Sequence, residues 1–388
     1  MVDPPLSVAE KANLILRVLT IAPLYLTKNV VLNLPVALLR GVVLRAALVG
    51  CVARTIFEAL PGRHIQTILP SDDQVYRSWI ASKRRTSPRG PDDLRLREDI
   101  EPVPGTGARL LWLGNRRTAT KFALFIHGGG FVMPMSDSML GWTWTAFIDG
   151  RDGEAKADVA IAVLQYTLAP AARQPEQLRE TVEALRFLLR EGGIAPENLL
   201  IGGDSAGGNL TAQALRHAVD PHPRIPPLGD LLGGNNSGRR LAGAFLVSPL
   251  VTQRVSAGSY RDNHRVDMLS GPVVKALSDV FVQRDPGTSE DEHAVDLAFV
   301  SPLDGDLEWL GRWENVVQAV YVTAGRHEVF HDDIVAFAGE VSRRNPGVEV
   351  RLDVGDNAIH DDILLEQAAP EPRVVTEKMR TWARSRGF

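Results

Sequence analysis

One hexapeptide decides the fold of this chain: Gly203-Asp204-Ser205-Ala206-Gly207-Gly208. It follows an apolar, strand-like run at 199–201 and precedes a predicted helix over 209–218. A Gly-x-Ser-x-Gly sequence between strand and helix favours a sharp turn, whose crowded backbone requires small residues beside the serine. The turn lifts the serine hydroxyl out of the sheet and points the first N–H groups of the helix at any negative charge formed there. Small residues also cluster in ordinary tight turns, so the pattern needs support from elsewhere.

A second glycine-rich stretch supplies that support. His127-Gly128-Gly129-Gly130-Phe131 follows another strand-like run at 122–126. Consecutive glycines after a buried strand let the backbone turn its N–H groups into a cavity, where they hold a developing oxyanion. We predict an oxyanion hole made by two of these three glycines together with Ala206, and the sequence leaves open which two.

Three motifs together resemble one family. HGGGF at 127–131, Tyr-Thr-Leu-Ala-Pro at 166–170 and GDSAGGN at 203–209 occur in the order found in the hormone-sensitive-lipase-like branch of the α/β-hydrolase superfamily. The resemblance covers about residue 108 to the C-terminus. It implies an α/β-hydrolase fold, with a mainly parallel central sheet flanked by helices and a helical N-terminal cap over the active site.

Composition limits the classes of protein to consider. The chain has 388 residues, of which 44% are hydrophobic and 23% charged, which is typical of a globular α/β domain with a smaller addition. Its net charge of −4 gives no indication of a nucleic-acid partner. Cys51 is the only cysteine, which excludes an internal disulfide framework and fits a reducing compartment. We expect no cofactor and a cytoplasmic protein, with membrane association as an open possibility.

Strand-length apolar runs alternate with helical segments from residue 105 onward. The expected strands are 108–113, 121–126, 159–165, 198–201, 242–247, 317–323 and 348–352, and the expected helices include 180–190, 333–342 and 374–384. Such alternation predicts a mainly parallel sheet covered on both faces. We therefore divide the chain into an N-terminal helical cap and linker region, 1–104, and a catalytic domain, 105–388, with a cap insertion near 253–300.

The N-terminal region is strongly apolar over residues 11–60. Pro23 and Pro35 interrupt its helical pattern, and charged residues limit the longest uncharged runs to 18–27 and 29–39. Both runs are shorter than the ~20 residues that a membrane span needs. The resemblance implies a cap over the active site, while attachment to a membrane surface and a true span remain alternatives.

A serine nucleophile needs a base and an orienting carboxylate, which follow it in that fold in the order acid, then histidine. Of the nine histidines, His360 follows the last predicted strand by a short turn. The acid should follow the strand at 317–323. Matched to the family pattern, Glu328 takes the place where an aspartate is usual, and Asp332 is the second candidate.

The tetrapeptide His-Asp-Asp-Ile occurs twice, at 331–334 and 360–363. Two such clusters on separate loops, without two histidines on one helix face, are a weak indication of metal binding, and we expect no metal.

The resemblance and these residues predict a serine hydrolase that cleaves an apolar small-molecule or acyl ester through an acyl-enzyme. Phe131, Met133 and Trp142 are candidates for the substrate pocket. The long N-terminal segment and the Trp-Leu-Gly sequence at 112–114 resemble fungal enzymes of small-molecule biosynthesis. Two alternatives stay open: the same triad in acyl transfer, lactonisation or cyclisation, and a non-catalytic receptor. The oligomeric state is likewise open.

Overall fold

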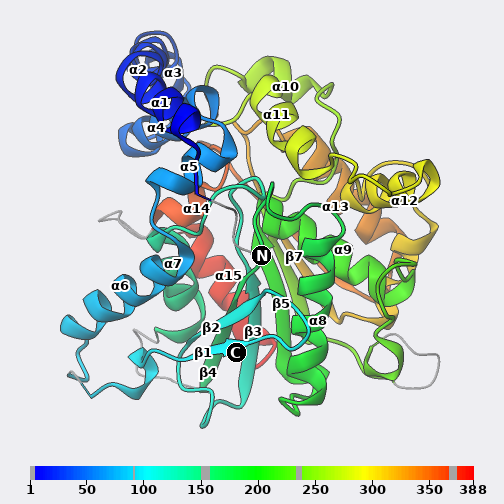
Figure 1. The fold of residues 1–388 in the computed structure, drawn as a ribbon. Helices are drawn as coiled ribbons and strands as arrows, with labels where there is room; N and C mark the ends of the chain where they lie inside the picture. The colour runs from blue at the N-terminus through cyan, green and yellow to red at the C-terminus, as the bar shows by residue number, and fades with distance from the viewer. Residues whose placement is uncertain (1–4, 91, 150–157, 233–237, 367–373) are drawn as a thin grey trace.

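A computed structural model describes residues 5–90, 92–149, 158–232, 238–366 and 374–388. These residues form an eight-stranded sheet surrounded by helices (Figure 1). The strands are β1 (Ile100–Pro102), β2 (Arg109–Leu113), β3 (Lys121–Ile126), β4 (Val159–Gln165), β5 (Leu199–Asp204), β6 (Gly243–Val247), β7 (Ala319–Gly325) and β8 (Glu349–Gly355). Their order is β1-β2-β4-β3-β5-β6-β7-β8. Strand β2 runs antiparallel to both neighbours and the other pairs are parallel, which confirms the predicted mainly parallel sheet. Strand β1 lies within the region predicted as cap and linker.

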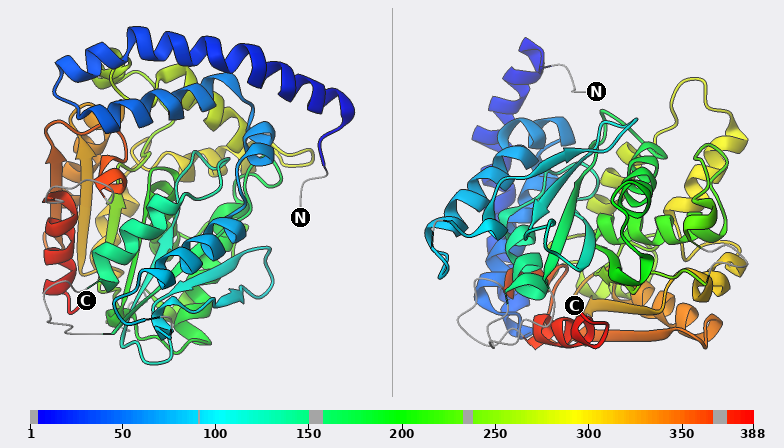
Figure 2. Two further views of the ribbon diagram at one scale, coloured as in Figure 1. Left: turned by 90° about the vertical axis from the view of Figure 1, so that its left-hand side faces the viewer. Right: turned by 90° about the horizontal axis from the view of Figure 1, so that it is seen from below.

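The helices lie on both faces of the sheet and beyond its upper end (Figures 1 and 2). They are α1 (Val8–Leu16), α2 (Ala22–Leu32), α3 (Leu34–Leu39), α4 (Leu44–Ala59), α5 (Gly62–Ile68), α6 (Asp72–Arg85), α7 (Asp137–Thr143), α8 (Glu176–Arg190), α9 (Ala206–Val219), α10 (Gly258–Asn263), α11 (Gly271–Phe281), α12 (Glu290–Val300), α13 (His331–Arg344), α14 (Asp362–Leu365) and α15 (Val374–Ser385).

Two hydrophobic cores fill the space between the sheet and the helices on its two faces. Successive side chains of a strand point to opposite faces. In β3, therefore, Leu124 and Ile126 enter one core, and Ala123 and Phe125 enter the other. Helices α8, α9 and α13 complete the first core, while α6, α7 and α15 complete the second. With both faces covered, the functional groups of the sheet emerge at the carboxyl ends of its parallel strands.

The N-terminal segment forms one long helix, and the prediction that prolines break it is wrong. Helices α1, α2 and α3 follow one another from Val8 to Leu39, with a π-helical turn over Arg17–Ile21. Pro23 lies in the first turn of α2, directly after that π-helical turn, where the missing N–H is tolerated. Helix α4 runs back beneath it (Figure 2). The helix is therefore longer than either uncharged run in the sequence. By length and composition it is long and apolar enough to cross a membrane.

Candidate active site

The serine of the opening hexapeptide lies at the junction of β5 and α9. Ser205 has φ 50° and ψ −113°, a backbone conformation that is uncommon and strained for a residue other than glycine. A side chain at Gly207 would collide with the carbonyl oxygen of Ile126 at the end of β3. The glycine is therefore required by the close approach of two backbone segments. The turn holds the Ser205 side chain, mostly buried, at the edge of a pocket.

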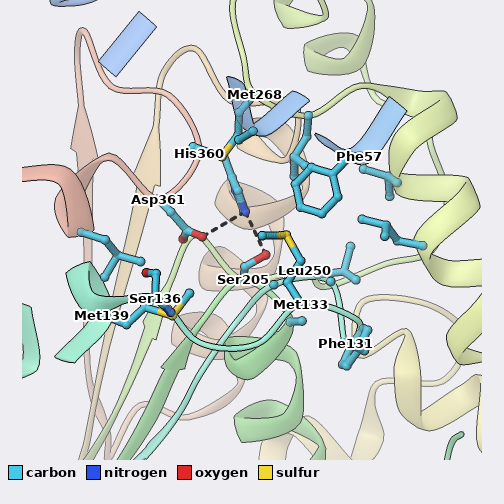
Figure 3. Close-up of a pocket in the computed structure, with 18 of the residues that line it drawn as sticks. Phe57, Phe131, Met133, Ser136, Met139, Ser205, Leu250, Met268, His360 and Asp361 are labelled. Carbon is cyan, nitrogen blue, oxygen red and sulfur yellow. Dashed lines mark hydrogen bonds and ion pairs between the residues drawn. The ribbon is translucent and has the colours of Figure 1, made fainter. Parts of the chain in front are cut away.

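Three predicted residues meet in a hydrogen-bonded series. The distance from His360 Nε2 to Ser205 Oγ is 2.8 Å, and the distance from His360 Nδ1 to Glu328 Oε2 is 2.9 Å. Figure 3 shows the imidazole directed at the serine hydroxyl. Glu328 lies just beyond β7 and His360 just beyond β8, so the parallel strands carry both side chains to the same edge as the serine. All three side chains are buried, which strengthens the electrostatic coupling between them.

The carboxylate beside the histidine is that of Glu328, and not that of the second candidate. Its other oxygen, Oε1, accepts a hydrogen bond of 2.6 Å from the N–H of Gly325. Asp332 lies in the first turn of α13, and its Oδ2 accepts a 2.8 Å hydrogen bond from the N–H of Ser259. A carboxylate is favourable at the N-terminus of a helix, so Asp332 has a structural explanation.

The glycine loop also shows which N–H groups face the pocket. The N–H of Gly128 donates to Asp204 Oδ1 at 3.0 Å, so Gly128 is the glycine of the three that does not offer its N–H to the pocket. Gly129 and Gly130 line the pocket together with Ala206, the first residue of α9. Within the described residues, neither of these two glycines donates its N–H to a hydrogen bond. The three remaining N–H groups are therefore free to bind a negative oxygen.

Residues of the Tyr-Thr-Leu-Ala-Pro motif hold this loop in place. The hydroxyl of Tyr166 donates to the carbonyl of His127 at 3.0 Å, and the N–H of Ala169 donates to the carbonyl of Phe131 at 2.8 Å. From α5, Gln66 Nε2 donates at 2.8 Å to the carbonyls of Val132 and Ala169. The motif and the N-terminal helices thus both position the loop.

A buried aspartate that the sequence analysis did not single out fastens the acid loop to the histidine loop. Asp267 Oδ2 accepts the N–H of Val329 at 2.8 Å, and Asp267 Oδ1 accepts the N–H of His360 at 3.0 Å. Burial raises the pKa of Asp267 to about 6, against the opposing charge of His360. No motif in the sequence marks Asp267, because its partners lie far away along the chain.

A second unanticipated carboxyl group lies beside the imidazole of His360. Asp361 Oδ2 is 3.3 Å from His360 Nε2 (Figure 3), and the backbone of Asp361 is left-handed, with φ 55°. Its Oδ1 is buried and has no hydrogen-bond partner among the described residues. Burial raises the pKa of this carboxyl group, whereas the charge of a protonated His360 lowers it, so the carboxylate and the imidazolium stabilise each other. Burial alone would lower the pKa of His360, but Asp361, Glu328 and Asp267 outweigh it and raise that pKa to about 10.

The substitution Asp361→Asn is expected to shift the acidic limb of the pH profile of kcat/KM to lower pH by ~1 unit or more, because a nearby carboxylate favours the imidazolium. The imidazole must be neutral to accept the serine proton, so activity rises as pH passes upward through the pKa of His360. The matched control is Asp362→Asn, because Asp362 is the neighbouring half-buried carboxyl group, and the charges that shift its pKa are those of Glu366 and Glu328. An unchanged limb in the first variant, or equal shifts in both, would show that Asp361 does not set this pKa.

The pocket has a volume of about 250 Å³ and is mainly apolar. Phe131 and Met133 line it as predicted, and Phe57 of α4 lines it from the N-terminal region. Its other apolar walls come from α4, from α7, from the region after β6, from the loop after β7 and from α14: Val49 and Ala53; Met139; Leu250, Met268, Leu269, Val274 and Leu277; Phe330; and Leu364 and Leu365. Helix α4 and the insertion after β6 thus line the pocket around the serine from two sides.

The prediction that Trp142 lines the pocket is wrong. Its ring is fully buried in the second core, where its centroid lies 6.0 Å from that of Phe125 and 6.1 Å from that of Phe245. Helix α7 therefore turns this side chain toward the sheet, and Met139 of the same helix faces the pocket instead.

Within the described residues, no group of three or more His, Cys, Asp or Glu side chains is arranged to hold a metal ion.

Comparison with known proteins agrees with this geometry. The family pattern described as the alpha/beta hydrolase fold matches residues 123–364, well over half of the chain. The chain belongs to this family. The α/β-hydrolase is 25% identical over 262 residues to an esterase of Acinetobacter venetianus, covering 66% of this chain and 73% of the relative. It is 23% identical over 282 residues to the carboxylesterase NlhH of Mycobacterium tuberculosis, covering 71% and 78% respectively.

Solved structures show the same fold. An esterase of the bacterial hormone-sensitive lipase family covers 88% of the α/β-hydrolase with 97% of its own chain, at a TM-score of 0.59 and 21% identity. A mutant of the esterase E40 covers 88% with 99% of its own chain, at a TM-score of 0.60 and 22% identity. The predicted α/β-hydrolase family and the predicted class, an esterase-like serine hydrolase, are confirmed, and the likeness to an esterase of the bacterial hormone-sensitive lipase family shows a shared fold. The resemblance to fungal enzymes stays a prediction.

Proposed function

We propose that this α/β-hydrolase is a carboxylic-ester hydrolase that uses Ser205 as nucleophile, His360 as general base and Glu328 as the orienting acid. The observation that carries the proposal is the unbroken series from Ser205 Oγ through both nitrogens of His360 to Glu328. A serine hydroxyl is a weak nucleophile at neutral pH, and this series is the arrangement that activates it. The esterases among its relatives support the same assignment.

In the proposed reaction, His360 Nε2 takes the proton of Ser205 as Oγ attacks the ester carbonyl carbon. The carbonyl oxygen becomes an oxyanion, which the N–H groups of Gly129, Gly130 and Ala206 bind. His360 then donates its proton to the alkoxy oxygen, so that the alcohol leaves and an acyl-enzyme remains. Water, deprotonated by the same imidazole, attacks the acyl-enzyme and releases the carboxylic acid and free Ser205.

We further propose that the substrate is an apolar small-molecule ester. Apolar side chains dominate the pocket wall, and they come from α4 as well as from the insertion after β6. Each buried CH₂ group contributes ~0.8 kcal/mol of transfer free energy, so an acyl chain of several carbons is preferred over acetate until it fills the pocket.

The proposal is tested by covalent labelling combined with hydrolysis of p-nitrophenyl esters from acetate to octanoate. We expect a fluorophosphonate to add one phosphonyl group to the peptide that contains Ser205, as measured by mass spectrometry, and kcat/KM to rise with acyl length before it falls. Absence of labelling would contradict an activated serine. Labelling without release of p-nitrophenol from any ester would instead favour transfer, lactonisation or cyclisation by the same triad.

A further inference from the structure

The long N-terminal helix presents an unusual outer surface. Residues 8–39 form a helix of 32 residues, which is about 48 Å long at ~1.5 Å per residue and crosses the top of the molecule (Figure 2). Only 6% of its most apolar 18-residue window is buried. A surface helix of a soluble protein normally turns its apolar stripe inward and its charges outward.

This helix has the opposite orientation from residue 12 onward, with its charged side chains, Arg17 and Lys28, bonded to the protein. Arg17 donates to the carbonyl of Ala59 at 2.9 Å, and Lys28 Nζ lies 2.8 Å from Glu58 Oε2 on α4. Asn29 is fully buried between the same helices. Arg17 and Lys28 are therefore satisfied by α4 beneath the helix.

The exposed residues between positions 12 and 39, here called the outer apolar face, carry no charge. Leu19 and Leu24 are 70% and 71% exposed. The face has three polar side chains: Asn13 accepts a hydrogen bond from Arg17, and the hydroxyls of Thr20 and Thr27 donate to backbone carbonyls one turn earlier. Interfaces between proteins carry about one hydrogen bond per 100–200 Å². A surface whose few polar groups are already bonded within their own helix suits hydrocarbon better than a protein partner.

Helix α4 connects this face to the active site. Val43, Leu44, Leu48 and Val52 are exposed on α4, and the neighbouring Val49, Ala53 and Phe57 line the pocket beside Ser205. Arg40 and Arg45 are exposed at the end of the hairpin. Basic side chains beside an apolar face match the phosphates of a lipid headgroup layer.

We propose that the outer apolar face lies in the plane of a lipid bilayer surface, with its leucines among the upper acyl carbons. Binding of this kind scales with the buried apolar area and with attraction between basic residues and anionic lipids. An ester dissolved in the membrane then reaches the pocket along α4. That source of substrate rests on the proposed ester hydrolysis, whereas docking on the bilayer does not.

The test is flotation of the full chain with vesicles of phosphatidylcholine and phosphatidylglycerol. The wild type should float with the vesicles, and Leu19→Glu/Leu24→Glu should reduce the floating fraction at least tenfold at an unchanged melting temperature. The matched control is Leu94→Glu/Val374→Glu, which changes side chains that are 64% and 57% exposed on other parts of the molecule. The control should float like the wild type.

Further measurements distinguish a bilayer surface from the other possible partners of the outer apolar face. A wild type that does not float, or an outer-face variant that still does, overturns the proposal. A wild-type dimer in light scattering that the variant disperses, without vesicle binding, assigns the face to a second copy. Retention in the membrane after alkaline carbonate extraction assigns the helix to a span. Ser205→Ala should float like the wild type, so that failure of docking and failure of the proposed chemistry are distinguished.

Discussion

Replacing Ser205 with alanine is expected to lower kcat for p-nitrophenyl butyrate by at least ~10⁴-fold, because a triad acts as a unit and what remains is binding and oxyanion stabilisation. The fold should persist. Alanine keeps the Cβ that already occupies this left-handed backbone position, so the strain at φ 50° is unchanged. The measurements are kcat at saturating ester and the melting temperature by circular dichroism.

The control for this variant is Ser278→Ala, which removes another buried hydroxyl from the wall of the same pocket on α11. Its hydroxyl does not touch His360, so its kcat should stay within a few-fold of the wild type. Comparable losses in the two variants would point to disturbance of the pocket, and retention of activity by Ser205→Ala would exclude the nucleophile.

The second large effect is expected from Glu328→Gln, which should lower kcat by ~10³–10⁴-fold, as loss of the orienting carboxylate does in other serine hydrolases. Both oxygens of Glu328 accept hydrogen bonds, one from the N–H of Gly325 and one from His360 Nδ1. Glutamine has one oxygen and one NH₂ group. If its NH₂ group faces the N–H of Gly325, two buried donors are opposed. If its NH₂ group instead faces His360 Nδ1, the imidazole proton is placed on Nε2, and Nε2 can no longer accept the serine proton.

Asp332→Asn is the matched control, because it makes the same chemical change in the other candidate acid. Asp332 lies in the first turn of α13 and accepts a hydrogen bond from the N–H of Ser259. Its substitution should therefore weaken this end of α13 slightly and leave kcat nearly unchanged. The comparison uses kcat of both variants at the pH optimum of each. A greater loss in Asp332→Asn than in Glu328→Gln would reverse the assignment of the acid.

Strands and turns that depend on residues adjacent along the chain were predicted from the sequence. The expected strands 121–126 and 159–165 coincide with β3 and β4, because a buried parallel strand needs a continuous apolar run. The turn at Ser205 was predicted for a related reason: the backbone crowding that excludes a side chain at Gly207 requires glycine within the motif itself. His360 was identified by its position after the last strand. Glu328 was chosen through the family pattern, since Asp332 fits the same loop by composition.

The sequence by itself therefore determined the strands from β2 to β8, the position of the sharp turn and the chain order of the candidate triad. The tertiary structure alone decided that Gly128 serves Asp204, that Trp142 faces the core, and that Asp267 and Asp361 surround His360. It also decided that Arg17 and Lys28 of the long N-terminal helix turn inward onto α4. The physical reason is the same in each case: the partner of the side chain or N–H group comes from a distant segment, and only packing of the elements brings the two together.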